Sequence, residues 1–196
     1  TAYLCTYHKA EWYTSVLNHS NNLERDISDI IASGIKILPP DIMISKMNWS
    51  YSHEENAIRF GLSDVKGVGE KAAKEIIKGQ KGNRNVPGFS EDNIWSFFKH
   101  PLINWRLAHS GVISKLIQCG AFDRYEEQIL EHFRNMREFH NAAWKYRKEF
   151  AEHEPDVAIQ RIKDKYDRYL DRQEKYASGE YNRRGTPNEP YWPFTF

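Results

Sequence analysis

The stretch of this sequence best suited to bind a ligand runs from Leu62 to Ile77. Gly67 and Gly69 flank Val68, between two segments whose apolar residues recur at helical spacing. Glycine permits a tight turn, and the absence of a Cβ atom lets a phosphate approach the backbone closely. The pattern is typical of a helix-hairpin-helix motif and predicts a turn that binds an anion.

The predicted site combines backbone amides with cationic side chains. We expect the amides of Val68, Gly69 and Glu70 to lie at the start of a helix, where unpaired donors and the helix dipole favour an anion. Three lysines would add positive charge: Lys66, Lys71 and Lys74. Such a turn would bind the backbone of duplex DNA without sequence preference. The alternative is a simple glycine turn between packed helices, with solvated lysines.

The charge of the chain is concentrated locally. The whole sequence carries a net charge of only +1, which argues against a uniformly basic nucleic-acid binder. Residues 59–84, however, contain seven basic and three acidic residues. Residues 1–58 contain four basic and seven acidic residues, and residues 124–176 contain twelve of each. The positive excess therefore lies in the segment that holds the glycine turn.

The first part of the chain is predicted to be helical and then extended. Apolar spacing indicates helices over residues 1–18 and 23–32, with Gly34 at the C-terminal cap of the second. A short strand is expected over residues 35–38, before Pro39-Pro40. Residues 49–51 and 57–60 are candidates for a small β-hairpin.

Helices dominate the remainder of the prediction. Residues 79–88 should form a loop, and Ser90 should cap a helix that ends before Pro101. A further helix is expected over residues 104–118. Beyond Arg124, two apolar stripes separated by Pro155 indicate a long antiparallel helical hairpin.

Four segments match a known family in order and spacing. They are Thr1-Ala2-Tyr3-Leu4 with Ala10-Glu11-Trp12, the linker Gly34–Ile42, the segment Ile58–Gly69, and Leu116-Ile117-Gln118-Cys119-Gly120-Ala121-Phe122-Asp123. Over residues 1–123 the sequence resembles the bacterial-type C-family DNA polymerases, a family that includes the DNA polymerase III alpha subunit. The matching part is the end of the fingers plus the tandem helix-hairpin-helix region.

The resemblance implies a second helix-hairpin-helix, with helices over residues 94–100 and 107–118. Its connecting turn, residues 101–106, has no Gly-x-Gly, so Arg106 and Lys115 are the candidate phosphate contacts there. The expected fold is mainly α with a small β-hairpin. It comprises fingers-like helices and a linker (1–40), the tandem DNA-binding domain (41–123), a helical hairpin (124–178) and an extended tail (179–196).

The resemblance also bounds the function. The family's magnesium-binding palm carboxylates lie upstream of this stretch, so we expect no catalytic residue, no metal site and no cofactor in this chain, and no activity of the chain alone. Magnesium is expected only for the complete polymerase. Because the sequence begins with Thr1, we expect a fragment, a processed product or part of a split gene.

The expected partners are double-stranded DNA and the remaining polymerase domains or a partner polymerase chain, in the cytoplasm of a bacterial or phage-infected cell. No signal sequence or long apolar run predicts a membrane contact. The alternative function is a stand-alone protein-interaction module that binds its partner through residues 124–196. The cysteines, Cys5 and Cys119, and the scattered histidines fit no metal-binding spacing.

Overall fold

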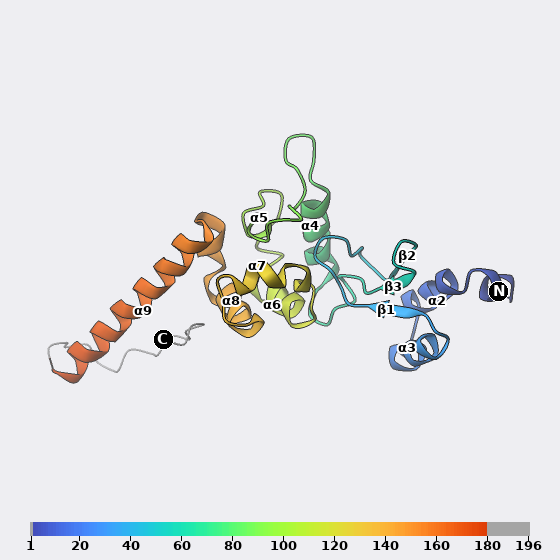
Figure 1. Cartoon of the computed structure of the whole chain (residues 1–196), viewed down its shortest axis with the longest axis horizontal. Helices are drawn as coiled ribbons and strands as arrows, with labels where there is room; N and C mark the ends of the chain where they lie inside the picture. Colours follow the sequence, from blue (N-terminus) through green and yellow to red (C-terminus); the bar gives the residue numbers. More distant parts are fainter. Residues whose placement is uncertain (1, 180–196) are drawn as a thin grey trace.

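The computed structural model describes residues 2–179, which form an elongated molecule (Figure 1). A small sheet with the N-terminal helices lies at one end, a central group of helices follows, and the last helix extends away at the other end. The described helices are α1 (Ala2–Tyr7), α2 (Lys9–Asn18), α3 (Leu23–Ala32), α4 (Glu70–Lys81), α5 (Trp95–Phe98), α6 (Ser110–Gln118), α7 (Glu126–Leu130), α8 (Met136–Glu152) and α9 (Pro155–Ala177). The chain is therefore mainly α, as predicted.

The small sheet contains the predicted β-hairpin and one further strand. Strands β2 (Ser50–Ser52) and β3 (Ala57–Arg59) pair antiparallel across the turn of residues 53–56. Strand β1 (Lys36–Leu38) pairs parallel with β3, so that β3 is central. The sequence predicted the three extended segments but not this pairing, because a parallel neighbour is joined through a long connection rather than through a local turn signal.

The N-terminal helices cover the sheet through a small core of their own. Leu17 of α2 and Ile30 of α3 are buried there against Trp49 and Ile58. Helix α3 has the predicted bounds, because the Asn22 side chain accepts a hydrogen bond from the amide of Arg25 at 3.3 Å and caps the helix. The single helix predicted over residues 1–18 is wrong. The backbone breaks at His8 (φ −134°, ψ 54°), where neither Gly nor Pro signals an end.

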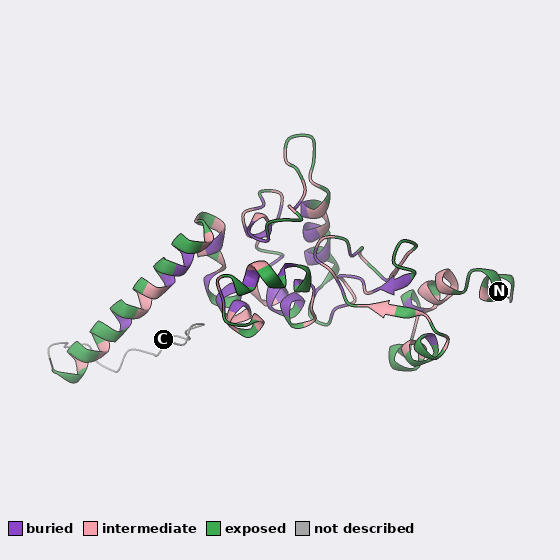
Figure 2. Ribbon diagram, in the orientation of Figure 1, coloured by how far each residue is buried: buried purple, intermediate pink, exposed green. Residues whose placement is uncertain are grey.

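The main core is built from aromatic rings of the central helices. Most of the described Phe residues are buried between α5, α6, α8 and the segments that connect them (Figure 2), among them Phe97, Phe98, Phe122, Phe133, Phe139 and Phe150. Their rings meet edge-to-face or tilted, with centroids 5.1–6.2 Å apart where they touch one another. These rings therefore serve packing.

Both predicted helices of the second unit are shorter than expected. Asparagine side chains accept hydrogen bonds from nearby backbone amides and so compete with continuation of the helix. Ser90 does not cap a helix. Instead, the Asn93 side chain accepts from the amide of Trp95 at 2.9 Å, and α5 begins there. Likewise, the Asn104 side chain accepts from the amide of Arg106 at 3.1 Å, so residues 104–109 are not helical and α6 begins at Ser110.

The helical hairpin after residue 124 is present with an altered start. A 3-10 turn (Asp123–Tyr125) and the short α7 precede it, and the Asn135 side chain caps α8 through the amide of Glu138. Pro155 is the first residue of α9, where it has no amide to leave unpaired. The Glu149 carboxylate of α8 accepts from Arg161 and Lys165 of α9, which joins the two helices. The predicted tail lies outside the described residues except for Gly179.

Candidate nucleic-acid interface

The glycine turn is fixed to the protein through its central residue. Val68 is buried, with 2% of its surface exposed, and its amide donates to the carbonyl of Val65 at 2.9 Å. Gly67 has φ +93°, a conformation that residues with a Cβ atom rarely adopt. Val68 therefore anchors the turn. The sequence predicts that its amide binds a phosphate, but this amide already donates within the turn and is not free to do so. The first hairpin helix expected before Gly67 consists only of turns over residues 62–67.

Gly69 places the start of α4 against open space. It is the N-cap residue, with φ −75° and ψ 159°, and a Cβ atom built on it would have no heavy atom within 4 Å. The carbonyl of Gly69 accepts from the amide of Ala73 at 3.0 Å, which begins the helical hydrogen bonds. The amides of Glu70 and Lys71 precede that first bond, so they have no intrahelical acceptor. An anion could therefore reach them and the positive end of the helix dipole.

Lysine side chains surround this helix start. Lys66, Lys71 and Lys74 are exposed, as are Gly67, Gly69 and Glu70. The Lys74 Nζ atom lies 3.6 Å from a carboxylate oxygen of Glu70, an exposed pair one helical turn apart. Within residues 2–179, Lys66 and Lys71 form no ion pair. Two cationic side chains are therefore available next to the free amides.

The structure brings Lys115 of α6 to the same turn. A Cβ atom on Gly67 would lie 3.4 Å from the Cγ atom of Lys115, whose Nζ atom donates to the Gln118 side chain at 3.2 Å. Sequence reasoning had assigned Lys115 to the second unit alone. Arg106, the other residue predicted for that unit, is exposed in the segment between α5 and α6. It does not line the cavity that lies beside the glycine turn.

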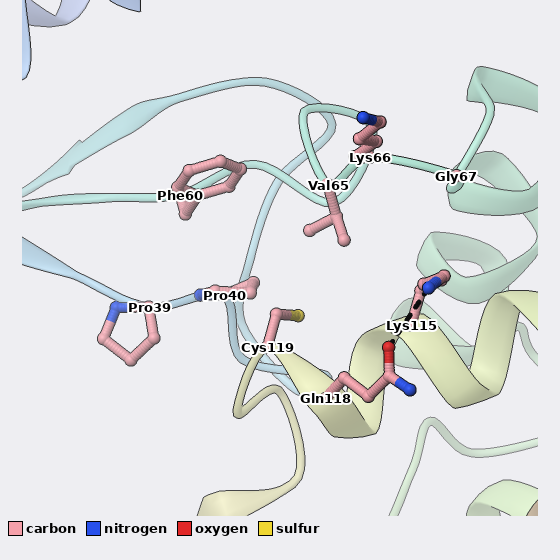
Figure 3. Close-up of a pocket in the computed structure, with 9 residues that line it drawn as sticks. All are labelled: Pro39, Pro40, Phe60, Val65, Lys66, Gly67, Lys115, Gln118 and Cys119. Atoms are coloured by element: carbon pink, nitrogen blue, oxygen red, sulfur yellow. Dashed lines mark hydrogen bonds between the residues drawn. The ribbon is translucent and has the colours of Figure 1, made fainter. Parts of the chain in front are cut away.

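A cavity of about 690 Å³ lies between the glycine turn, the linker and α6 (Figure 3). Val65 points into it from the turn, the Cys119 sulfur lies on the opposite side, and Lys66 and Lys115 stand at its edge. The remaining lining residues are Pro39, Pro40, Phe60, Gly67 and Gln118. Burial raises the pKa of the Cys119 thiol, which donates to the carbonyl of Leu116 at 3.2 Å. The cavity is thus largely apolar with a cationic rim.

Sequence reasoning did not foresee this cavity. The Gly34–Ile42 segment was identified as a linker from its motif, and nothing in that motif indicates which later residues it contacts. Its prolines line the same cavity as α6, and the amide of Ile42 donates to the carbonyl of Ala121 at 2.9 Å, just after α6 ends. Pairing of residues so distant in the sequence has no local signal.

The two helical units are joined through a buried carboxylate. Glu75 of α4, 7% exposed, accepts from the amide of Asn104 at 3.1 Å and from Lys78. The Lys78 hydrogen bond, against the opposing effect of burial, lowers the pKa of Glu75, and the Asn104 amide adds to this. Packing of Gly79 against Phe89 and Ile103 adds apolar contact at the same junction. These contacts join α4, which directly follows the glycine turn, to the second unit.

Within residues 2–179, no group of three His, Cys, Asp or Glu side chains is placed to hold a metal ion. No helix in the same range is both long and apolar enough to cross a membrane.

Residues 34–129 match a family model described as a helix-hairpin-helix motif. Over 126 residues, 63% of this chain, the sequence is 34% identical to the DNA polymerase III subunit alpha of Aquifex aeolicus. Proteins of the same name from Halalkalibacterium halodurans and Thermus aquaticus are 30% and 31% identical over 65% of the chain. The matched parts are 10–11% of these relatives, so the chain corresponds to about a tenth of their length.

Proposed function

Because residues 34–129 form a helix-hairpin-helix region related to that of the DNA polymerase III alpha subunits, we propose that this chain binds duplex DNA as part of a replicative polymerase. The DNA would be the primer–template duplex, and the remaining polymerase domains or a partner polymerase chain would supply the catalytic centre. The contact is to the phosphate backbone and is independent of sequence.

The observation that carries this proposal is the open space in front of Gly69. A phosphate placed there meets the free amides of Glu70 and Lys71 and the dipole of α4. Lys66, Lys71 and Lys115 supply charge from two directions, since Lys115 stands on α6 and not on α4. Backbone contacts of this kind position a duplex and do not distinguish base pairs.

Gly69→Val tests the proposal, because Gly69 has ordinary backbone angles and room for a side chain. The variant should fold like the parent and bind a fluorescent primer–template duplex at least about tenfold more weakly, since the side chain fills the space that the phosphate needs. Gly67→Ala should weaken binding too, at some cost in stability from its positive φ.

Gly34→Ala is the matched control for backbone strain. Gly34 also has a positive φ, of +82°, and a Cβ atom added to it would have no heavy atom within 4 Å, but it lies at the end of α3. The Gly34→Ala variant should lose stability much as Gly67→Ala does and keep the parent's affinity for DNA. Unchanged DNA binding by folded Gly69→Val would refute the assignment of the site.

A second function, as a protein-interaction module, is supported by exposed apolar side chains after residue 124. Leu130, Val157 and Leu170 have 44–50% of their surface exposed on α7 and α9. A partner protein that covers them would be retained in a pull-down after nuclease treatment. Loss of the partner on nuclease treatment would instead favour association through DNA.

A further inference from the structure

Three surface cavities surround the exposed edge of α6 and share residues with one another. Lys115 lines both the cavity at the glycine turn and a second one of about 510 Å³ between α6 and α8. His140 and Asn141 line the second cavity and a third of about 500 Å³. The three hollows therefore follow one path from the glycine turn along α6 to α8.

The path is cationic although the chain is nearly neutral. Four basic side chains line the three cavities, and no carboxylate does: Lys66, Lys115, Arg137 and Lys145. Over residues 124–176 as a whole, by contrast, acidic and basic residues are equal in number. A local field of one sign attracts polyanions and extends beyond the turn before α4.

An exposed indole stands in the second cavity. Trp144 of α8 has 51% of its surface exposed, although most other large aromatic side chains of the central helices are buried. A Cβ atom on Gly111 would lie 3.5 Å from the Cζ3 atom of Trp144, so the ring is supported by the start of α6. A supported ring with an exposed surface can accept a stacked aromatic ligand at little entropic cost.

Polar groups lie beside this indole. The His140 Nε2 atom is 2.6 Å from the Ser114 hydroxyl and 3.2 Å from the Gln118 amide nitrogen, which fixes the imidazole between α6 and α8. The Asn141 amide and the exposed Lys145 ammonium complete the lining. In such a groove the aromatic ring can stack on the base of a nucleotide, the hydrogen-bonding groups can bind the edge of that base, and the cations can bind its phosphate.

We propose that the groove between α6 and α8 binds an unpaired nucleotide of DNA, with its base stacked on Trp144 and its phosphates near Lys115 and Lys145. This site goes beyond the proposed duplex contact, because a base stacked inside a duplex has no free face for a side chain. Lys115, which lines two cavities, connects it with the glycine turn. A strand that leaves the duplex at the turn would enter this groove.

The experiment compares three fluorescent probes: a blunt duplex, the same duplex with a single-stranded thymidine extension, and single-stranded thymidine DNA. The parent should bind the extended duplex more tightly than the blunt one. Trp144→Ala should weaken binding of the extended probe about tenfold, since base–aromatic stacking contributes on that scale, and should leave the blunt duplex unaffected. Trp144→Phe should keep much of the affinity.

Two controls and a second variant complete the test. Tyr7→Ala removes an aromatic side chain that is 70% exposed on α1, and Lys148→Ala removes an exposed lysine of α8 that lines none of the three cavities. Both should bind all probes like the parent. Lys145→Ala should weaken binding of the extended duplex severalfold. This variant tests the site even if Trp144→Ala fails to fold.

The outcomes separate this site from the proposed function. If the parent binds blunt and extended duplexes equally, or if Trp144→Ala and Lys145→Ala leave the extended probe unaffected, the nucleotide site is refuted and the duplex contact stands. If single-stranded DNA binds through Trp144 while no blunt duplex binds, the duplex proposal fails and this one holds. Absence of binding to every probe overturns both proposals.

Discussion

The Arg124 guanidinium donates two hydrogen bonds to the Asp41 carboxylate, from Nε at 3.0 Å and from Nη2 at 2.9 Å to the same Oδ2 oxygen. The other carboxylate oxygen accepts from the amide of Met43 at 2.8 Å. Asp41 follows the two prolines of the linker, and Arg124 follows the close of the second unit. The pair therefore joins the two ends of the segment 41–123, which we propose is the folding unit of the interface.

We expect this ion pair to stabilise the fold measurably. Its Asp41 side chain is only 13% exposed, so solvent screens it less than a surface pair, whereas Arg124 at 35% is more accessible. Asp41→Asn and Arg124→Gln should each lower the free energy of unfolding by about 1–2 kcal/mol. The double variant should lose less than the two single losses together, with a coupling of about 0.5–1.5 kcal/mol in urea unfolding. Strict additivity would show that the pair contributes nothing.

Two glycines near the interface should differ in how much stability the addition of one methyl group costs. A Cβ atom on Gly61 would lie less than 3.0 Å from the backbone of Asn48 and from the Asp64 carboxylate, and the Asn48 backbone cannot rotate away. Gly61→Ala should therefore destabilise the protein by about 1–3 kcal/mol. Gly69→Ala, with open space around it, should change stability by less than about 1 kcal/mol. Thermal unfolding of both variants measures the contrast, and equal losses would contradict it.

Local signals predicted most elements of the fold. Gly34 and Pro155 lie at helix ends as expected, because each acts through its own backbone. Ser90 misled the prediction, since a serine before acidic residues also suits a turn, and the Asn93 side chain determines where α5 begins.

The candidate site was only partly predictable for a related reason. Gly67, Gly69 and the nearby lysines lie in one stretch of sequence, so their pattern indicated a turn and a helix start. The approach of Lys115 to Gly67 depends on how α6 packs against the turn, and the position of α6 depends on contacts such as Glu75 with Asn104. Long-range packing of this kind is encoded in shape and burial, which no short motif specifies.

The buried Glu75 carboxylate should make stability depend on pH. Its pKa is lowered in the folded protein, chiefly by the hydrogen bond from Lys78, so the folded state holds the proton less tightly than the unfolded chain. The stabilisation is complete above the unfolded pKa of about 4.3 and is lost as the pH falls through the lower folded value. Glu75→Gln lacks this dependence and should be less stable than the parent at about pH 7. Urea unfolding of both proteins between about pH 7 and about pH 3 should show the difference shrinking as the pH falls. A constant difference would show that Glu75 does not act through its charge.

The salt dependence of DNA binding should identify the lysines that contact phosphate. Each contact releases counterions, so the logarithm of the affinity falls linearly with the logarithm of the salt concentration, by about 0.9 per neutralised phosphate on duplex DNA. Lys66→Ala, Lys71→Ala and Lys115→Ala should each weaken duplex binding and reduce this slope by about one. Lys74→Ala should reduce it less, since Glu70 already pairs with Lys74 at 3.6 Å. Lys148→Ala on α8, exposed but outside the three cavities, serves as the control and should keep the parent's slope. If Lys148→Ala reduced the slope as much as Lys115→Ala does, binding would depend on the overall charge of the chain. Lys115 beside Gly67 would then make no specific contact with phosphate.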